Sequence, residues 1–158
     1  MAETPLPHLN ERGDARMVDV SAKEVSARSA TAAGLVRLSP EAVAALRSDS
    51  LPKGDALAVA RIAGIQAAKK TPDLVMLCHP LALSGVDVGL SVVDEGVQIE
   101  ATVRTTDRTG VEMEALTAVS VASLTLVDMV KAVDKHARIT DVRVVAKSGG
   151  RSGDWTAP

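Results

Sequence analysis

The chain has almost no aromatic side chains: its 158 residues include no Phe, no Tyr and a single Trp, Trp155. Proteins that bind single-stranded nucleic acid usually stack the bases on aromatic rings, so this composition argues against that function. The formal net charge of -2 at pH 7 also gives no overall basic surface for a phosphate backbone. We therefore expect no nucleic-acid partner.

The sequence has a single cysteine, and we expect neither an export signal nor a membrane-spanning run. The single Cys78 cannot form an intrachain disulfide, which fits a reducing compartment. The N-terminus contains early acids and no apolar signal-peptide core, and we expect no apolar run long enough to cross a bilayer. The spacings C-x-x-C and H-E-x-x-H do not occur, so no zinc site is expected. The sequence thus predicts a cytoplasmic protein with no membrane partner and no metal.

The length of the chain suggests one domain. Residues 1–16 mix Pro, His, Asn, Gly and charged side chains without periodicity, which is typical of a flexible arm. Residues 17–147 carry the periodic segments of the predicted single α+β domain. Residues 148–158 form a predicted Gly-rich, loop-like tail. Within the domain, the four residues 17–20 (MVDV) could add a short edge strand.

Capping signals and hydrophobic periodicity divide the domain into strands and helices. Ser39 followed by Pro40 is a strong helix start. Strands are expected at 29–38, at two places within 84–107 around a turn near residues 94–96, and at 137–147. Besides the helix at Pro40, helical segments are expected at 53–70, briefly before His79, and at 111–133. This β-α-β-β-α-β order predicts a ferredoxin-like fold, an antiparallel sheet with helices on one face.

The long helical segment has no Asp, Glu, Lys or Arg between residues 115 and 127. A helix that is apolar on all sides is buried on all sides, and the sheet can cover only one, so we expect a second subunit on the other. Asp128 and Lys131 then follow in a place expected to be partly buried. Taken alone, this pair is better interpreted as an ordinary salt bridge near a helix end. Glu114 and Asp128 would lie about 21 Å apart along the helix, so they could share one small ligand only across a two-fold axis.

Other polar residues are candidates for binding, each with an ordinary structural explanation beside it. His79, within MLCHPL, could be a half-buried structural histidine, and Glu112 and Glu114 suit the start of any helix. The lysines are scattered and, taken singly, are solvated charges. The glycines around Arg151 could form an anion-binding nest, although a flexible tail is the simpler interpretation.

Taken together, four stretches resemble the cyclic pyranopterin monophosphate synthase family. They are MVDVSAKEVSARSATAAG, KGDALAVARIAGIQAAKKTPDLVMLCHPLALSGVDV, TGVEMEALTAVSVASLTLVDMVKAVDK and VVAKSGGRSGDW. The likeness extends from about residue 16 to residue 155, and these motifs are long and specific.

The resemblance implies a ferredoxin-like lyase of molybdenum cofactor biosynthesis. Such an enzyme converts (8S)-3′,8-cyclo-7,8-dihydroguanosine 5′-triphosphate to cyclic pyranopterin monophosphate and releases pyrophosphate, without a metal or organic cofactor. The assembly implied is a homohexamer, built as a trimer of dimers with the active site at the dimer interface. The alternative is a ferredoxin-like domain that senses a small molecule without catalysis.

The resemblance also assigns roles by position. Asp128 matches the proposed catalytic acid/base, and Lys131 its catalytic neighbour. The matching substrate-binding residues are Leu77, Cys78, His79, Glu112, Met113, Glu114, Lys53, Lys69 and Lys147. The reaction needs several proton transfers and no redox step, which a coupled carboxylate and ammonium could serve.

Overall fold

A computed structural model describes residues 7–158, so the first six residues of the predicted arm lie outside the described part. The elements in chain order are β1 (Ser26–Arg37), α1 (Pro40–Arg47), α2 (Ala56–Lys69), α3 (Thr71–Leu74), β2 (Leu83–Val93), β3 (Gly96–Asp107), α4 (Glu112–Val130), β4 (Arg138–Ser148) and β5 (Trp155–Thr156). The predicted α+β class is confirmed, and each expected strand and helix of the domain core is present within a few residues.

The five strands form one antiparallel sheet in the order β2-β3-β1-β4-β5. The hairpin between β2 and β3 turns at Asp94 and Glu95, as expected. Gly96 follows with a φ of 147°, where a Cβ would collide with the Val36 carbonyl of β1. This glycine therefore lets the hairpin cross close to its neighbouring strand.

The helices begin where the sequence places their caps. The Ser39 hydroxyl accepts a hydrogen bond from the Ala42 backbone N–H at the start of α1, with Pro40 in the first turn. The Asp55 carboxylate caps α2 in the same way by accepting from Ala58 N–H. Each of these two helix starts is thus stabilised by a side chain three residues before the N–H group that it accepts from.

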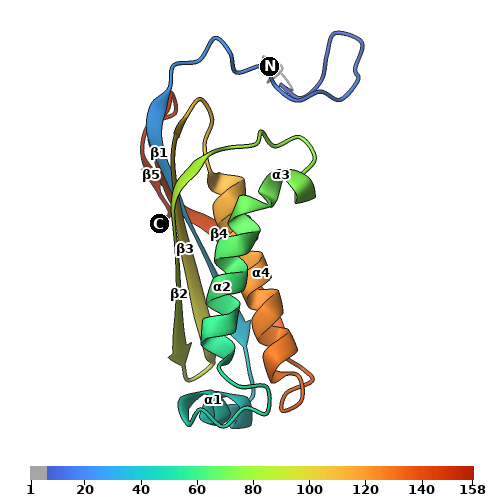
Figure 1. Ribbon diagram of the computed structural model, residues 1–158, viewed down its shortest axis with the longest axis vertical. Coiled ribbons are helices and arrows are strands. Elements are labelled where there is room, and N and C mark those ends of the chain that lie inside the picture. Colours follow the sequence, from blue (N-terminus) through green and yellow to red (C-terminus); the bar gives the residue numbers. More distant parts are fainter. Residues whose placement is uncertain (1–6) are drawn as a thin grey trace.

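The two long helices, α2 and α4, run in opposite directions beside each other on one face of the sheet (Figure 1). The core between the layers is built from small and branched side chains, among them Val97, Ile99 and Val103 of β3 and Val119 and Leu126 of α4. Gly64 of α2 lies against α4, where an added Cβ would be 3.0 Å from the Ala118 carbonyl oxygen. This close approach holds the two helices in a fixed relation.

The outer side of α4 is not covered by the chain itself. Leu124 is 61% exposed, and Val59 and Ile62 of α2 are exposed nearby in the same helical layer. By length and composition α4 could also span a membrane, with a mean hydropathy of 1.5, so the expectation that no apolar run reaches that length is wrong. Half of that stretch is buried inside the molecule, as in the core helix of a globular protein.

Two segments near the ends of the described residues 7–158 differ from the secondary structure expected for them. Residues 17–20 are not a strand; their backbone instead runs past His79, whose ring nitrogen lies 2.6 Å from the Val18 oxygen. Residues 8–16 fold into a turn with a bridge between Leu9 and Ala15. The tail is not only loop, because Trp155 and Thr156 pair with Lys147 and Ala146 of β4. This pairing returns the tail to the sheet edge next to Lys147.

Candidate active site

Most of the predicted site residues form two groups at opposite ends of the α2–α4 layer. Lys53, Asp128 and Lys131, which we call the Asp128 cluster, lie where α4 ends and the chain enters α2. The second group lines a cavity of about 520 Å³ where α4 begins, and we call it the His79 pocket. Its predicted members are Leu77, Cys78, His79, Glu112, Met113 and Glu114.

The Asp128 carboxylate contacts a different ammonium group with each oxygen. Lys131 Nζ lies 2.6 Å from Oδ1, and Lys53 Nζ lies 2.9 Å from Oδ2 and also donates to the Asp128 backbone oxygen at 3.0 Å. The spacing of Asp128 and Lys131 predicts the first contact. It does not predict the second, because Lys53 is 75 residues away in the chain.

The two lysines determine the charge state of Asp128. Hydrogen bonds from Lys131 and then Lys53, together with their positive charges, lower the pKa of Asp128 to about 2. The carboxylate is therefore ionised at neutral pH and holds two protonated amines in place. In the single chain the Asp128 side chain is 55% exposed, so its expected partial burial depends on a second subunit.

A buried carboxylate fixes the loop that follows Lys131. Asp134 accepts hydrogen bonds from the backbone N–H groups of Ser39, at 2.7 Å, and His136, at 2.8 Å. It is buried in the chain. Because Ser39 is the N-cap of α1, this contact ties the end of α4 to the start of α1.

The His79 pocket contains a buried carboxyl group, Glu114. Glu114 is only 3% exposed, and its pKa is raised by that burial and by the negative charge of Glu112. Burial, with a smaller contribution from Glu114, also raises the pKa of the Cys78 thiol. Cys78 is thus a thiol and not a thiolate, which suits contact with a ligand and not nucleophilic attack.

Lys147 reaches the edge of the same pocket from β4. Its Nζ lies 3.0 Å from Glu112 Oε1, and both side chains are 28% exposed. On the other side of Glu112, a Cβ at Gly110 would collide with the carboxylate. The Glu112 carboxylate therefore lies between the Lys147 ammonium group and the backbone at Gly110.

Lys69 is not brought into either group. It lies exposed in the last turn of α2, and within residues 7–158 the structure gives it no hydrogen bond or ion pair. It is the last residue of α2, two residues before α3 begins at Thr71.

A basic cavity adjoins the His79 pocket; the sequence analysis pointed to its glycines and Arg151 as a possible anion nest but missed its other basic residues. This tail pocket, of about 400 Å³, is lined by Lys23, Ser26, Arg28, Gly150 and Arg151, among others. Lys23 lines the His79 pocket as well. The Ser26 hydroxyl is buried there and has no hydrogen-bond partner within residues 7–158. Lys23 and Arg28 lie in the first of the four resemblance stretches, which is the signal that could have identified them.

Gly149 and Gly150 shape this cavity. Both have φ near +80°, at 84° and 79°, and a Cβ on Gly149 would collide with the Ala27 carbonyl. The glycines thus allow the tail to lie against β1, where Arg28 Nε donates to the Asp107 carbonyl at 3.0 Å. The result is a concave surface with three basic side chains, Lys23, Arg28 and Arg151, and one acidic side chain, Glu24.

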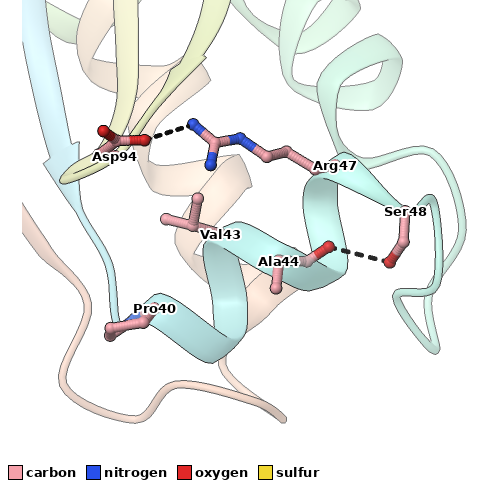
Figure 2. Close-up of a pocket in the computed structure, with 6 residues that line it drawn as sticks. All are labelled: Pro40, Val43, Ala44, Arg47, Ser48 and Asp94. Atoms are coloured by element: carbon pink, nitrogen blue, oxygen red, sulfur yellow. Dashed lines mark hydrogen bonds and ion pairs between the residues drawn. The ribbon is translucent and has the colours of Figure 1, made fainter.

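A further hollow of about 530 Å³ lies beside α1 and is shown in Figure 2. Its two charged side chains, Arg47 and Asp94, pair with each other at 2.8 Å, and Pro40, Val43 and Ala44 supply mostly apolar lining. None of the predicted site residues lines it. It therefore offers no unpaired group for chemistry.

Between residues 7 and 158, no three His, Cys, Asp or Glu side chains are placed to hold a metal ion. The Asp128 cluster and the His79 pocket are separated by 14 residues of α4, about 21 Å between Glu114 and Asp128. One chain alone cannot bring both to the same small molecule.

Comparisons with known proteins give a consistent result. The model of the MoaC family matches residues 17–150. A cyclic pyranopterin monophosphate synthase of Streptomyces coelicolor is 69% identical over 151 residues, 96% of this chain and 89% of that protein. The synthase of a Nocardioides species is 63% identical over 163 aligned positions that cover 100% of both chains. Cyclic pyranopterin monophosphate synthase 2 of Mycobacterium tuberculosis is 61% identical over 151 residues, 96% of this chain and 90% of that protein.

Proposed function

Since this chain belongs to the MoaC family, we propose that it is a cyclic pyranopterin monophosphate synthase, a lyase of molybdenum cofactor biosynthesis. It converts (8S)-3′,8-cyclo-7,8-dihydroguanosine 5′-triphosphate to cyclic pyranopterin monophosphate and releases pyrophosphate. The observation that carries this proposal is the 63% identity to a synthase that is covered over its full length.

The Asp128 cluster is the proposed centre of proton transfer. With a pKa of about 2, Asp128 stays ionised, so its role is to orient Lys131 and Lys53. The two ammonium groups can donate protons to a developing anion and take them back in later steps. A reaction that opens one ring and closes another needs several such transfers, which supports a cluster with two amines.

The His79 pocket is the proposed binding site for the base. Its volume of about 520 Å³ suits a compact bicyclic ligand. Leu77, Cys78 and Met113 supply its less polar lining, while Glu112 and Glu114 can accept hydrogen bonds from ring N–H and amino groups.

The tail pocket and Lys147 are proposed to bind the triphosphate. Lys23, Arg28 and Arg151 surround a cavity in which the Ser26 hydroxyl lacks a partner. Positive side chains and backbone N–H groups stabilise a departing pyrophosphate. Lys69, at the same end of the molecule, is a further candidate for the outer phosphate.

The complete site is proposed to form between two chains. A two-fold axis through the exposed apolar side of α2 and α4, which includes Ile62 and Leu124, would cover that side. It would also bring the Asp128 cluster of one chain to the His79 pocket of its partner, closing the distance of about 21 Å. We propose a hexamer of three such dimers.

The finer assignments of fold and location follow from the same proposal. The order β2-β3-β1-β4, with α2 between β1 and β2 and α4 between β3 and β4, supports a ferredoxin-like fold. We propose residues 17–147 as the catalytic domain, with 1–16 as an arm and 148–158 as a tail, in a cytoplasmic enzyme without a cofactor.

The activity is tested by incubating the purified chain with the cyclised nucleotide and measuring pyrophosphate and the pterin product. Equimolar formation of both is expected. A sensing domain would bind the nucleotide and return it unchanged, which would refute the proposed function.

The shared site is tested by mixing two inactive variants, Asp128→Asn and His79→Ala, after dissociation and reassembly. A mixed dimer then contains one site with both changes and one with neither, so about a quarter of the wild-type activity returns after equal mixing. If each site lies within one chain, no activity returns. Each variant reassembled alone is the control.

A further inference from the structure

His79 makes one side-chain hydrogen bond in the structure, and its partner is a backbone carbonyl. His79 Nε2 lies 2.6 Å from the Val18 oxygen, across 61 residues of chain. A carbonyl oxygen can only accept, so Nε2 must carry the proton. In the neutral imidazole, Nδ1 is then the nitrogen with a free lone pair.

Both partners lie in irregular segments that have few other ties. Residues 17–20 belong to no strand, and within residues 7–158 their other hydrogen bonds stay local, such as Ser21 N–H to Asp19 Oδ1 and Lys23 N–H to the Val20 oxygen. His79 lies in the loop between α3 and β2, where Cys78 N–H bonds locally to the Val75 oxygen. The bond from His79 to Val18 therefore joins two loops that the sheet does not hold.

The position of this bond gives it a function. Val18 and Val20 line the His79 pocket together with His79, Cys78 and Glu114. Within residues 7–158 no hydrogen bond is found for Nδ1. The nitrogen with the free lone pair thus belongs to a ring that borders the cavity and is left for a ligand.

We propose that residues 17–20 are a positioning segment for His79: the Val18 carbonyl fixes the tautomer with hydrogen on Nε2, and Nδ1 accepts a hydrogen bond from an N–H or O–H group of the ligand. The identity of that ligand rests on the proposed function, whereas the tautomer of His79 does not. Val18 acts through its backbone, so its side chain carries none of this specificity.

The tautomer is measured by NMR on full-length protein labelled with ¹⁵N in histidine only. The chain has three histidines, His8, His79 and His136, and His79→Gln assigns the signal of interest. At about pH 8.5, roughly two units above the ordinary histidine pKa, the rings of free histidines are neutral. We expect His79 to have hydrogen on Nε2 alone, while the exposed His136 shows an average of both tautomers. Hydrogen on Nδ1, or the same average as His136, would overturn the proposal.

A second measurement tests the tie between the two loops. In His79→Gln the side-chain amide can still donate near the place of Nε2, whereas in His79→Asn the amide is too short to reach Val18. We expect hydrogen exchange in residues 17–21 to stay near wild type with Gln and to rise about fivefold with Asn, the effect of one net hydrogen bond. Equal exchange in the two variants would contradict the proposal.

His136→Gln and His136→Asn are the matched controls, and neither should change exchange in residues 17–21. Both measurements are made without substrate. If wild-type protein fails to convert the cyclised nucleotide, the proposed function fails, while the tautomer and the exchange pattern still decide the role of Val18. The proposal requires both expected results.

Discussion

Replacing Asp128 by Asn is the sharpest test of the proposed centre of proton transfer. The substitution keeps the shape of the side chain but removes the negative charge that holds two ammonium groups, one on each oxygen at 2.6 and 2.9 Å. The amide NH₂ would then face an ammonium group and repel it. Lys131 is then expected to leave its position, whereas Lys53 can keep its hydrogen bond to the Asp128 backbone oxygen at 3.0 Å.

The size of the effect follows from this shared geometry. A positioned acid or base contributes about 10²–10⁴-fold to a rate, so we expect Asp128→Asn to lose about 10³-fold. Lys131→Ala should lose nearly as much. Because the two residues act as one unit, the double variant should be at most about tenfold worse than either single one. Independent residues would instead give losses that multiply to about 10⁶-fold.

The assay is a single-turnover measurement with enzyme in excess over the cyclised nucleotide, quenched and analysed for pyrophosphate. Glu95→Gln is a matched control, since Glu95 pairs with Arg37 at 2.9 Å and is 55% exposed, like Asp128. The control should keep wild-type rate, and all variants should keep wild-type circular dichroism. A near wild-type rate in either single variant, or losses that multiply, would refute the reasoning.

Three further predictions follow from the same structure. Because the pKa of Asp128 is lowered in the folded protein to about 2 from its ordinary value of 3.8, its stabilising effect is present above pH 3.8 and is lost as pH falls through about 2. Urea titrations in that window should show a loss of stability in wild type that Asp128→Asn lacks. Leu124→Asp should give monomers in analytical ultracentrifugation, whereas Leu124→Ala should not; an assembled Asp variant would contradict the proposed interface. Tripolyphosphate should protect residues 148–154 from hydrogen exchange in wild type but not in Arg28→Ala; equal protection would exclude the tail pocket as the anion site.

The sequence predicted the parts of the fold that depend on local signals. The helix cap at Ser39 and the turn at Asp94 and Glu95 depend only on residues close together in the chain, and the structure confirms both. Two short segments were predicted wrongly for the same reason. Residues 17–20 alternate like a strand but donate no ladder bonds, and the strand at Trp155 is only two residues long. Four residues or fewer carry too little periodicity to decide their pairing.

The site was harder to predict because its contacts cross the chain. Lys53 meets Asp128 only because α2 and α4 run in opposite directions, and no spacing rule connects residues 75 positions apart. Lys23 lines the tail pocket from the segment before β1, and Arg28 lines it from the start of β1. In the sequence, each of them alone is an ordinary surface charge. The partial burial of Asp128 stays a prediction about the proposed dimer, because in the single chain its side chain is 55% exposed.

The absence of charge between residues 115 and 127 follows from the positions of the His79 pocket and the Asp128 cluster, the two half-sites of the proposed reaction. The polar groups of the proposed reaction are placed at the two ends of α4, Glu112 and Glu114 at its start and Asp128 at its end. The middle of the helix then has to pack against the sheet on one side and, in the proposed dimer, against a partner on the other. A charge there would lie desolvated between the two chains. The length of the charge-free stretch also sets the distance between half-sites, so inserting or deleting a helical turn would move both sites of a dimer out of register at once.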